Sequence, residues 1–139
     1  SLGAFDLDVT YDSNVLAFDS VSFGDPILGD QLDLFGLGGM TDSSDSGSSV
    51  NIYEVSFDEV ADLIAMQSDE FVMATLTFST VGYGTSAIDV LINDLSDASG
   101  TNSLTADAIG SSVQVVPVPA ALPLLVSGLL FIGIKRRKA

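Results

Sequence analysis

The chain contains no Cys and no His. Without Cys there are no disulfide bonds. The absence of both residues excludes nucleophilic catalysis by a Ser-His or Cys-His pair, and it excludes zinc sites built from His or Cys. Lys and Arg are also scarce, with four in total, all at positions 135–138. Residues 1–116 therefore have no side chain that could clamp a phosphate or an anionic transition state, and we predict no nucleic-acid binding.

Negative charge is what the chain has in abundance. All 19 acidic residues lie between Asp6 and Asp107, so residues 1–116 carry a formal net charge of −19 and the remainder carries +4, which gives the total of −15. A uniformly negative field favours cations and solubility. The stretch of 116 residues also matches the usual size of one domain, roughly 100 to 150 residues.

Short stretches of alternating polar and apolar residues, separated by Gly, Ser, Asp and Asn, run through this region. In the first of them, Phe5, Leu7, Val9 and Tyr11 share one face, which is typical of a half-buried strand. The whole pattern predicts an all-β fold, an antiparallel β-sandwich. Its expected strands are residues 4–11, 15–23, 31–38, 50–57, 71–81, 86–92 and 111–116.

Two of these expected strands carry further detail. In the second, the alternation changes parity between Phe18 and Val21, which predicts a β-bulge or a break. In the fourth, Tyr53, Val55 and Phe57 share one face, and we expect Tyr53 to point toward the core.

One segment departs from the β pattern. Val60, Leu63 and Ile64 recur at helical spacing behind Asp58, a candidate N-cap, so we predict a short crossover helix within residues 58–67. The sequence also predicts two long loops, the first of them mobile, at residues 36–49 and 93–107.

Two stretches resemble the cohesin family: SLGAFDLDVTYDSNVLAFDSVSFGD at 1–25 and ATLTFSTVGYGTSAIDV at 74–90. In that family the first of these strands is followed by the residues YD, and the residues VL then lead into a second strand. A later strand with the residues TLTF precedes a turn with the residues GTS. The resemblance implies a cohesin-like jelly roll. Because such domains have a further strand ahead of the segment that opens this chain, we expect a missing first strand and an exposed sheet edge.

The same resemblance implies a binding partner, either a carbohydrate or a dockerin-like protein, since cohesin-like domains are related in fold to carbohydrate-binding modules. Sugar rings usually stack on exposed aromatic side chains. The chain has no Trp, and Tyr11 and Tyr53 share parity with core residues, which leaves Tyr83 beside a Gly-flanked turn. A specific sugar site is therefore the weaker alternative.

Carboxylates are the remaining candidates for catalysis. Asp58, Glu59, Asp69 and Glu70 are the most concentrated group, and a pair of them would suit a hydrolase of the glycosidase type. Adjacent acidic residues at the start of a helix or in a turn more often cap the backbone there and face solvent than act in catalysis. We therefore predict no catalytic residue and no enzyme activity.

Calcium is more compatible with this composition, because it prefers oxygen ligands. Asn93, Asp94 and Asp97, followed by Gly100, form the best candidate site, although their spacing does not match an EF-hand loop. The alternative is an ordinary Asx-rich turn. Asp42 and Asp45 form a weaker candidate in a Ser-rich segment.

The end of the chain has a different character. The 17 residues from Val118 to Ile134 carry no charge and would form a helix about 25 Å long, the short end of a bilayer span. We predict a transmembrane helix at about residues 119–134, with the C-terminus cytoplasmic and residues 1–116 outside. The basic stop consists of Lys135, Arg136, Arg137 and Lys138.

Residues 117–139 also resemble a PEP-CTERM sorting signal of the VPLPA-like variant: a Pro motif, an apolar helix and a basic end. The motif residues are Val116, Pro117, Val118, Pro119 and Ala120. The resemblance implies an exosortase in the bacterial inner membrane as partner, and release of the domain to the cell surface or an exopolysaccharide matrix. We thus predict an exported, non-enzymatic surface or matrix protein; the alternative is a permanently anchored binding module.

Overall fold

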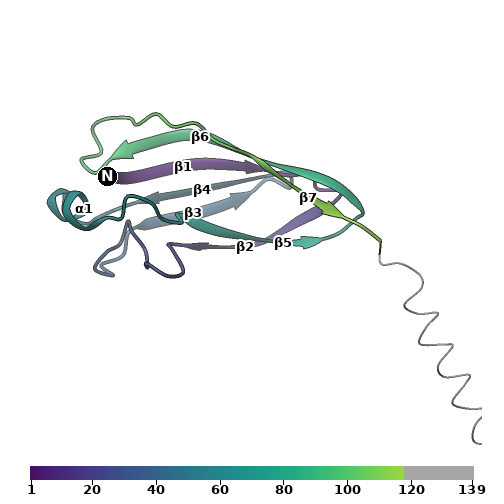
Figure 1. Ribbon diagram of the computed structural model, residues 1–139, viewed down its shortest axis with the longest axis horizontal. Coiled ribbons are helices and arrows are strands. Elements are labelled where there is room, and N and C mark those ends of the chain that lie inside the picture. Colours follow the sequence, from purple (N-terminus) through teal and green to yellow (C-terminus); the bar gives the residue numbers. More distant parts are fainter. Residues whose placement is uncertain (118–139) are drawn as a thin grey trace, which may run out of the picture.

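The computed structural model describes residues 1–117. These residues form seven strands and one short helix, drawn in Figure 1. In chain order these are β1 Leu2–Thr10, β2 Leu16–Phe23, β3 Met40–Asp45, β4 Ser49–Val55, α1 Val60–Met66, β5 Ala74–Thr80, β6 Gly84–Asp97 and β7 Ser111–Val115. The predicted all-β class, with one short helix, is confirmed.

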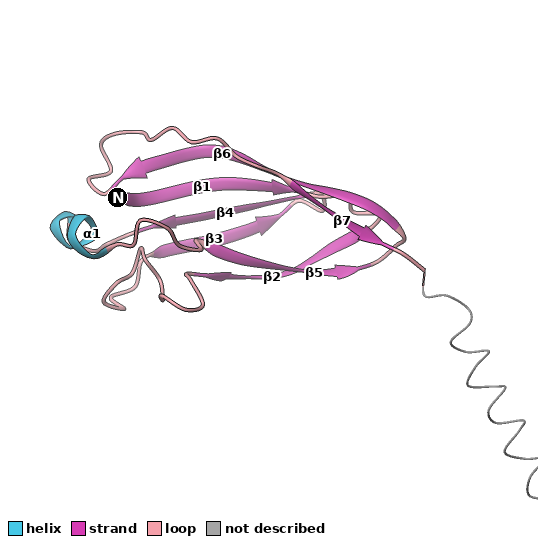
Figure 2. Cartoon of the chain, viewed as in Figure 1, coloured by secondary structure: helices cyan, strands magenta, loops and turns pink. Residues whose placement is uncertain are grey.

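The strands form two antiparallel sheets (Figure 2). One has the order β3-β4-β1-β6-β7, and the other contains only β2 and β5. β1 is central because it pairs with β4 on one side and β6 on the other. β7 pairs with the beginning of β6, at residues 84–88. In the other sheet, β2 is the only strand within residues 1–117 that pairs with β5.

The core lies between the sheets and follows the predicted alternation of β1. Phe5, Leu7 and Val9 are buried, as is Tyr11 just beyond the strand. The ring of Tyr11 meets Phe78 of β5 edge to face, with centroids 5.1 Å apart. Aromatic and aliphatic side chains of strands far apart in sequence therefore hold the two sheets together.

The predicted irregularity in the second strand is confirmed. The pairing of β2 with β5 shifts register between Phe18 and Ser20, which marks a bulge or irregularity. In β5, Ala74, Leu76 and Phe78 are partly buried and pack against the core.

The strand expected at residues 31–38 is wrong. Residues 24–39 are a loop with bends and turns, in which four glycines have positive φ: Gly24, Gly29, Gly36 and Gly38. Asp33 accepts backbone N–H groups of Leu37 and Gly38, and Asp30 accepts that of Leu32. Such local bonds compete with strand pairing and override the apolar alternation.

The mobile loop expected at residues 36–49 is also wrong. Its second half is β3, which forms a hairpin with β4, and the tight turn between them uses Gly47 at φ 92°. Most β3 side chains are exposed because the strand lies at the edge of its sheet. An edge strand with little buried surface shows no apolar alternation in its sequence.

β4 places the opposite face inward from the one expected. Val50, Ile52 and Glu54 are buried, whereas Tyr53 and Val55 lie on the outer side. The register with β1 sets this orientation, because Ile52 lies opposite Leu7 and Glu54 opposite Phe5.

The helix is confirmed, but Asp58 is not its N-cap. Glu59 occupies that position without a side-chain cap bond, and Asp58 instead accepts the N–H of Leu34 at 2.6 Å. The loop expected at 93–107 begins later, since β6 continues to Asp97.

Within residues 1–117, none of the structure's helices is long and apolar enough to cross a membrane. The predicted transmembrane helix at 119–134 and the basic stop at 135–138 lie outside the described residues.

Candidate functional site

The outer face of the five-stranded sheet gathers carboxylates from three strands, β1, β3 and β6. Residues directly opposite each other in antiparallel strands point to the same side. Asp6 lies opposite Tyr53 and Asp94, and Asp8 lies opposite Asn51 and Leu91. The surface, here called the acidic sheet face, consists of Asp6, Asp8, Asp42, Asn51, Tyr53, Asp89, Leu91, Asn93 and Asp94.

Two asparagine amides organise the centre of this face. The Nδ2 of Asn51 donates to Oδ1 of Asp6 at 2.7 Å and to Oδ1 of Asp8 at 2.9 Å. The Nδ2 of Asn93, on the other side of β1, donates to the same oxygen of Asp6 at 3.1 Å. Each amide thus fixes a carboxylate across a strand boundary and leaves acceptor capacity toward solvent.

The amides of this face favour the charged form of Asp8. The amide of Asn51, followed by that of Asn93, lowers the pKa of Asp8 from its ordinary value of 3.8. Asp6 and Asp94 lie directly opposite each other, an arrangement of like charges that destabilises a sheet. Residues 1–117 contain no Lys or Arg to offset it. A cationic partner would relieve this repulsion.

Apolar side chains lie among the charges. Leu91 is 54% exposed although it faces Asp8 from the middle of β6, and Tyr53 is partly exposed between Asp6 and Asp42. Met40, at the start of β3, is also exposed. A sheet face that combines aromatic and aliphatic side chains with charged ones is able to bind a protein surface through apolar packing and through electrostatic attraction.

The residues proposed for calcium do not share hydrogen-bond partners. Asn93 donates to Asp6, Asp94 accepts from the Ser96 hydroxyl at 3.0 Å, and Asp97 closes the turn that follows β6. The amide of Asn102 and the hydroxyl of Ser99 lower the pKa of Asp97 from 3.8 to about 2. The calcium site stays a prediction.

The four acids weighed as a hydrolase pair separate into two groups. Asp69 and Glu70 line an open groove of about 460 Å³ together with Leu2, Phe71 and Met73, and Asp58 and Glu59 do not line it. Asp58 is buried and bonded to Leu34. Across the described part of the chain, no three His, Cys, Asp or Glu side chains are placed to hold a metal ion.

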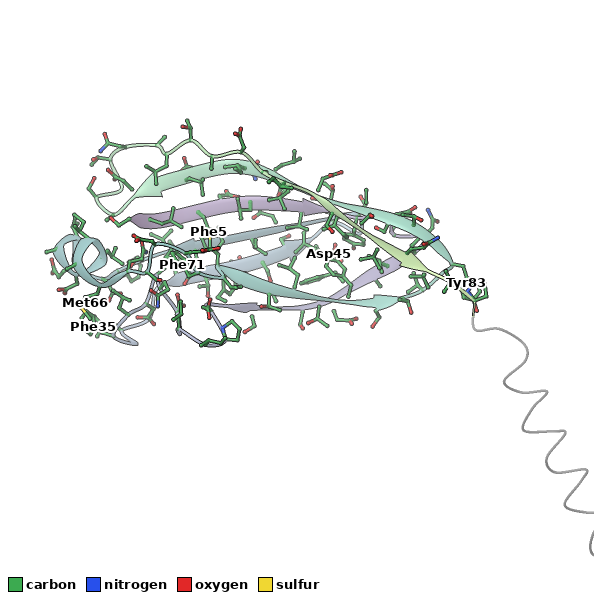
Figure 3. All side chains as sticks on the ribbon, in the orientation of Figure 1. Phe5, Phe35, Asp45, Met66, Phe71 and Tyr83 are labelled. Atoms are coloured by element: carbon green, nitrogen blue, oxygen red, sulfur yellow. The ribbon has the colours of Figure 1, made fainter. Side chains whose placement is uncertain are left out.

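The other predicted binding residues lie away from the acidic sheet face. Tyr83 is 71% exposed at the end of the sandwich opposite α1 (Figure 3). Val116 is exposed just after β7, and the motif residues Val118, Pro119 and Ala120 lie outside the described range.

Sequence reasoning missed the acidic sheet face as a site. The alternation of Asp6 and Asp8 within β1 predicted that they point to solvent, and this is the signal that could have been followed. Asn51 and Asn93 come from distant strands, so only the sheet order brings them to the two aspartates.

No protein-family model and no curated protein matches the chain. Solved structures do resemble it. The non-cellulosomal cohesin from the hyperthermophilic archaeon Archaeoglobus fulgidus superposes with a TM-score of 0.60 at 17% identity, over 86% of this chain and 75% of that chain. The fold is cohesin-like.

Two further structures support the cohesin-like fold. The sixth cohesin from scaffoldin B of Acetivibrio cellulolyticus, solved in complex with a Cel5 dockerin, gives a TM-score of 0.58 at 16% identity over 84% of this chain and 79% of that chain. A type I cohesin–dockerin complex from Clostridium thermocellum gives 0.59 at 14% identity over 83% and 78%. The fold predicted from the stretches at 1–25 and 74–90 is confirmed.

Proposed function

We propose that residues 1–117 form a non-enzymatic protein-binding module whose acidic sheet face binds a basic, dockerin-like partner. One observation carries the proposal: Asp6, Asp8, Asp42, Asp89 and Asp94 share one sheet face in a segment without a single basic residue. The cohesin structures solved with dockerins support a partner of this class.

The geometry suits rapid and oriented binding. A negative field steers a cationic partner and raises its association rate, and this effect weakens as salt is added. Asn51 and Asn93 hold Asp6 and Asp8 in place before the partner arrives, so little side-chain freedom is lost on binding. Leu91 then supplies apolar contact in the middle of the face.

Binding to dockerin modules, with the Cel5 dockerin of Acetivibrio cellulolyticus included, tests the proposal. The double variant Asp6→Asn with Asp8→Asn should weaken binding by about tenfold or more, which equals about 1.4 kcal/mol. The matched control is Asp19→Asn with Asp69→Asn, which removes the same charge from exposed positions, one on β2 and one beside the groove lined by Phe71. Equal loss in both double variants, or no binding by any dockerin, would refute the proposal.

We further propose that the protein is exported and sorted by an exosortase. The support is the sequence of the tail: the Pro motif at 116–120, the uncharged segment up to Ile134 and the basic end. Cleavage near Val116 would remove all four positive charges and leave an anionic domain that anionic lipid headgroups repel. Its destination would be the cell surface or the exopolysaccharide matrix.

Mass spectrometry of the protein from its native host tests the sorting proposal. The expected mature C-terminus lies near the Pro motif, and it should depend on the sorting peptidase. Recovery of an intact Lys135–Ala139 terminus in the envelope would instead support the alternative, a permanently anchored binding module.

A further inference from the structure

Glu54 occupies a position that usually belongs to an apolar residue. On β4 it follows Val50 and Ile52 along the buried face, and only 1% of its surface is exposed. Phe5 of β1 and Thr41 of β3 lie opposite it in the two neighbouring strands. A carboxyl group in such a place requires a partner, because a buried charge without one is strongly unfavourable.

The described residues supply no donor to this carboxyl group. No N–H or O–H group of residues 1–117 donates to Oε1 or Oε2 of Glu54, and these residues contain no Lys, Arg or His to balance a charge. The titratable groups that act on it are Asp30 and Asp33, both from the loop 24–39. A buried carboxylate that faces two others and no cation is strongly disfavoured, so Glu54 must hold a proton.

We propose that Glu54 is a proton latch: its protonated carboxyl group donates to the carboxylate of Asp30 and holds the loop 24–39 against the core. Loss of the proton leaves two facing negative charges, and the loop then separates from the sheet. Burial, followed by the neighbouring Asp30 and Asp33, raises the pKa of Glu54 from 4.5 to about 8. The latch is therefore closed at neutral pH and opens in alkaline solution.

Other contacts of the loop show what the latch controls. Leu32 is buried in the core. Asp58 accepts the N–H of Leu34 with one carboxylate oxygen, and its other oxygen is buried without a partner among the described residues. Phe35 is half exposed at the end of the sandwich where Met66 of α1 also lies (Figure 3). Opening the loop would uncover Leu32 and rearrange this apolar end of the molecule.

Hydrogen exchange at about pH 6 and about pH 9.5 tests the latch, with rates converted to protection factors. In the wild-type protein, protection within residues 24–39 should fall by about tenfold or more, because each pH unit above the pKa multiplies the ratio of ionised to protonated Glu54 tenfold. Protection of β1 should not change. Glu54→Gln has the same shape, donates an N–H to Asp30 and does not titrate, so its loop should keep its protection.

An equal fall in Glu54→Gln would overturn the proposal. A second result would also overturn it: protection of the loop by millimolar calcium at neutral pH in the wild type and not in Glu54→Gln. In that case a cation, and not a proton, would neutralise the carboxyl group.

Carboxyl ¹³C NMR provides a second readout that does not require a folded Glu54 variant. The chain has three Glu residues, and Glu59→Gln and Glu70→Gln assign the other two signals. Titration of the Glu54 signal below about pH 6 would refute the latch.

Discussion

Replacing Leu32 by Ala tests whether the loop 24–39 is part of the core. Leu32 is 1% exposed although its segment forms no strand. Each buried methylene contributes about 0.8 kcal/mol, and the cavity left behind adds to that loss, so Leu32→Ala should lower the free energy of unfolding by about 2 to 5 kcal/mol. This is a large share of the roughly 5 to 15 kcal/mol that stabilises a typical domain.

Leu37→Ala is the matched control, because Leu37 lies in the same loop and is 71% exposed. It removes the same atoms from the surface and should change stability by less than about 0.5 kcal/mol. Urea unfolding followed by circular dichroism measures both variants, and the slope with urea should stay the same. A loss below about 1 kcal/mol for Leu32→Ala, or equal losses for the two variants, would show that the loop does not pack as described.

Three further predictions concern polar contacts. The hydroxyl of Tyr11 donates to Asp45 at 2.9 Å, so Tyr11→Phe should cost about 1.5 kcal/mol in urea unfolding, and no loss would mean that the bond is not formed in solution. Asn51→Leu should raise the pKa of Asp8 toward its ordinary value of 3.8 in an NMR titration, whereas an unchanged pKa would exclude the amide as the cause. Because the pKa of Asp97 is lowered from 3.8 to about 2, its stabilising effect is complete above pH 3.8 and is lost as the pH falls through 2. The difference in thermal midpoint between wild type and Asp97→Ala should therefore shrink over that range, and a constant difference would contradict the assignment.

The sequence predicted those elements whose side chains alternate between core and solvent. β1 is the clearest, since Phe5, Leu7 and Val9 are all buried. β3 escaped prediction because an edge strand of Thr, Ser and Asp has little apolar surface to show in its pattern. The alternation of Leu32 and Leu34 favoured a strand at residues 31–38, whereas Asp30 and Asp33 bind local backbone amides and keep this segment in a loop.

The candidate site was less accessible to sequence reasoning than the fold. The solvent-facing position of Asp6 and Asp8 follows from their alternation within β1. Their bonds with Asn51 and Asn93 depend on which strands are neighbours, and the sheet order is a long-range property. Glu54 gave no signal at all, because an acid in an alternating strand is expected to face water.

Within residues 1–117, β5 pairs only with β2, so its other edge is free, and this has a practical consequence for handling the protein. Residues 74–80 contain no Pro, Lys or Asp, the residues that often protect an exposed strand edge from pairing with another copy. Mutual repulsion between molecules carrying −19 over residues 1–116 takes over that protective role. Repulsion reaches about 8 Å in physiological salt and only about 3 Å at 1 M salt, and acidification toward the pI of about 4.1 removes it. Concentrated salt and buffers near pH 4 should therefore promote edge-to-edge precipitation, whereas dilute buffer at neutral pH should keep the molecules dispersed.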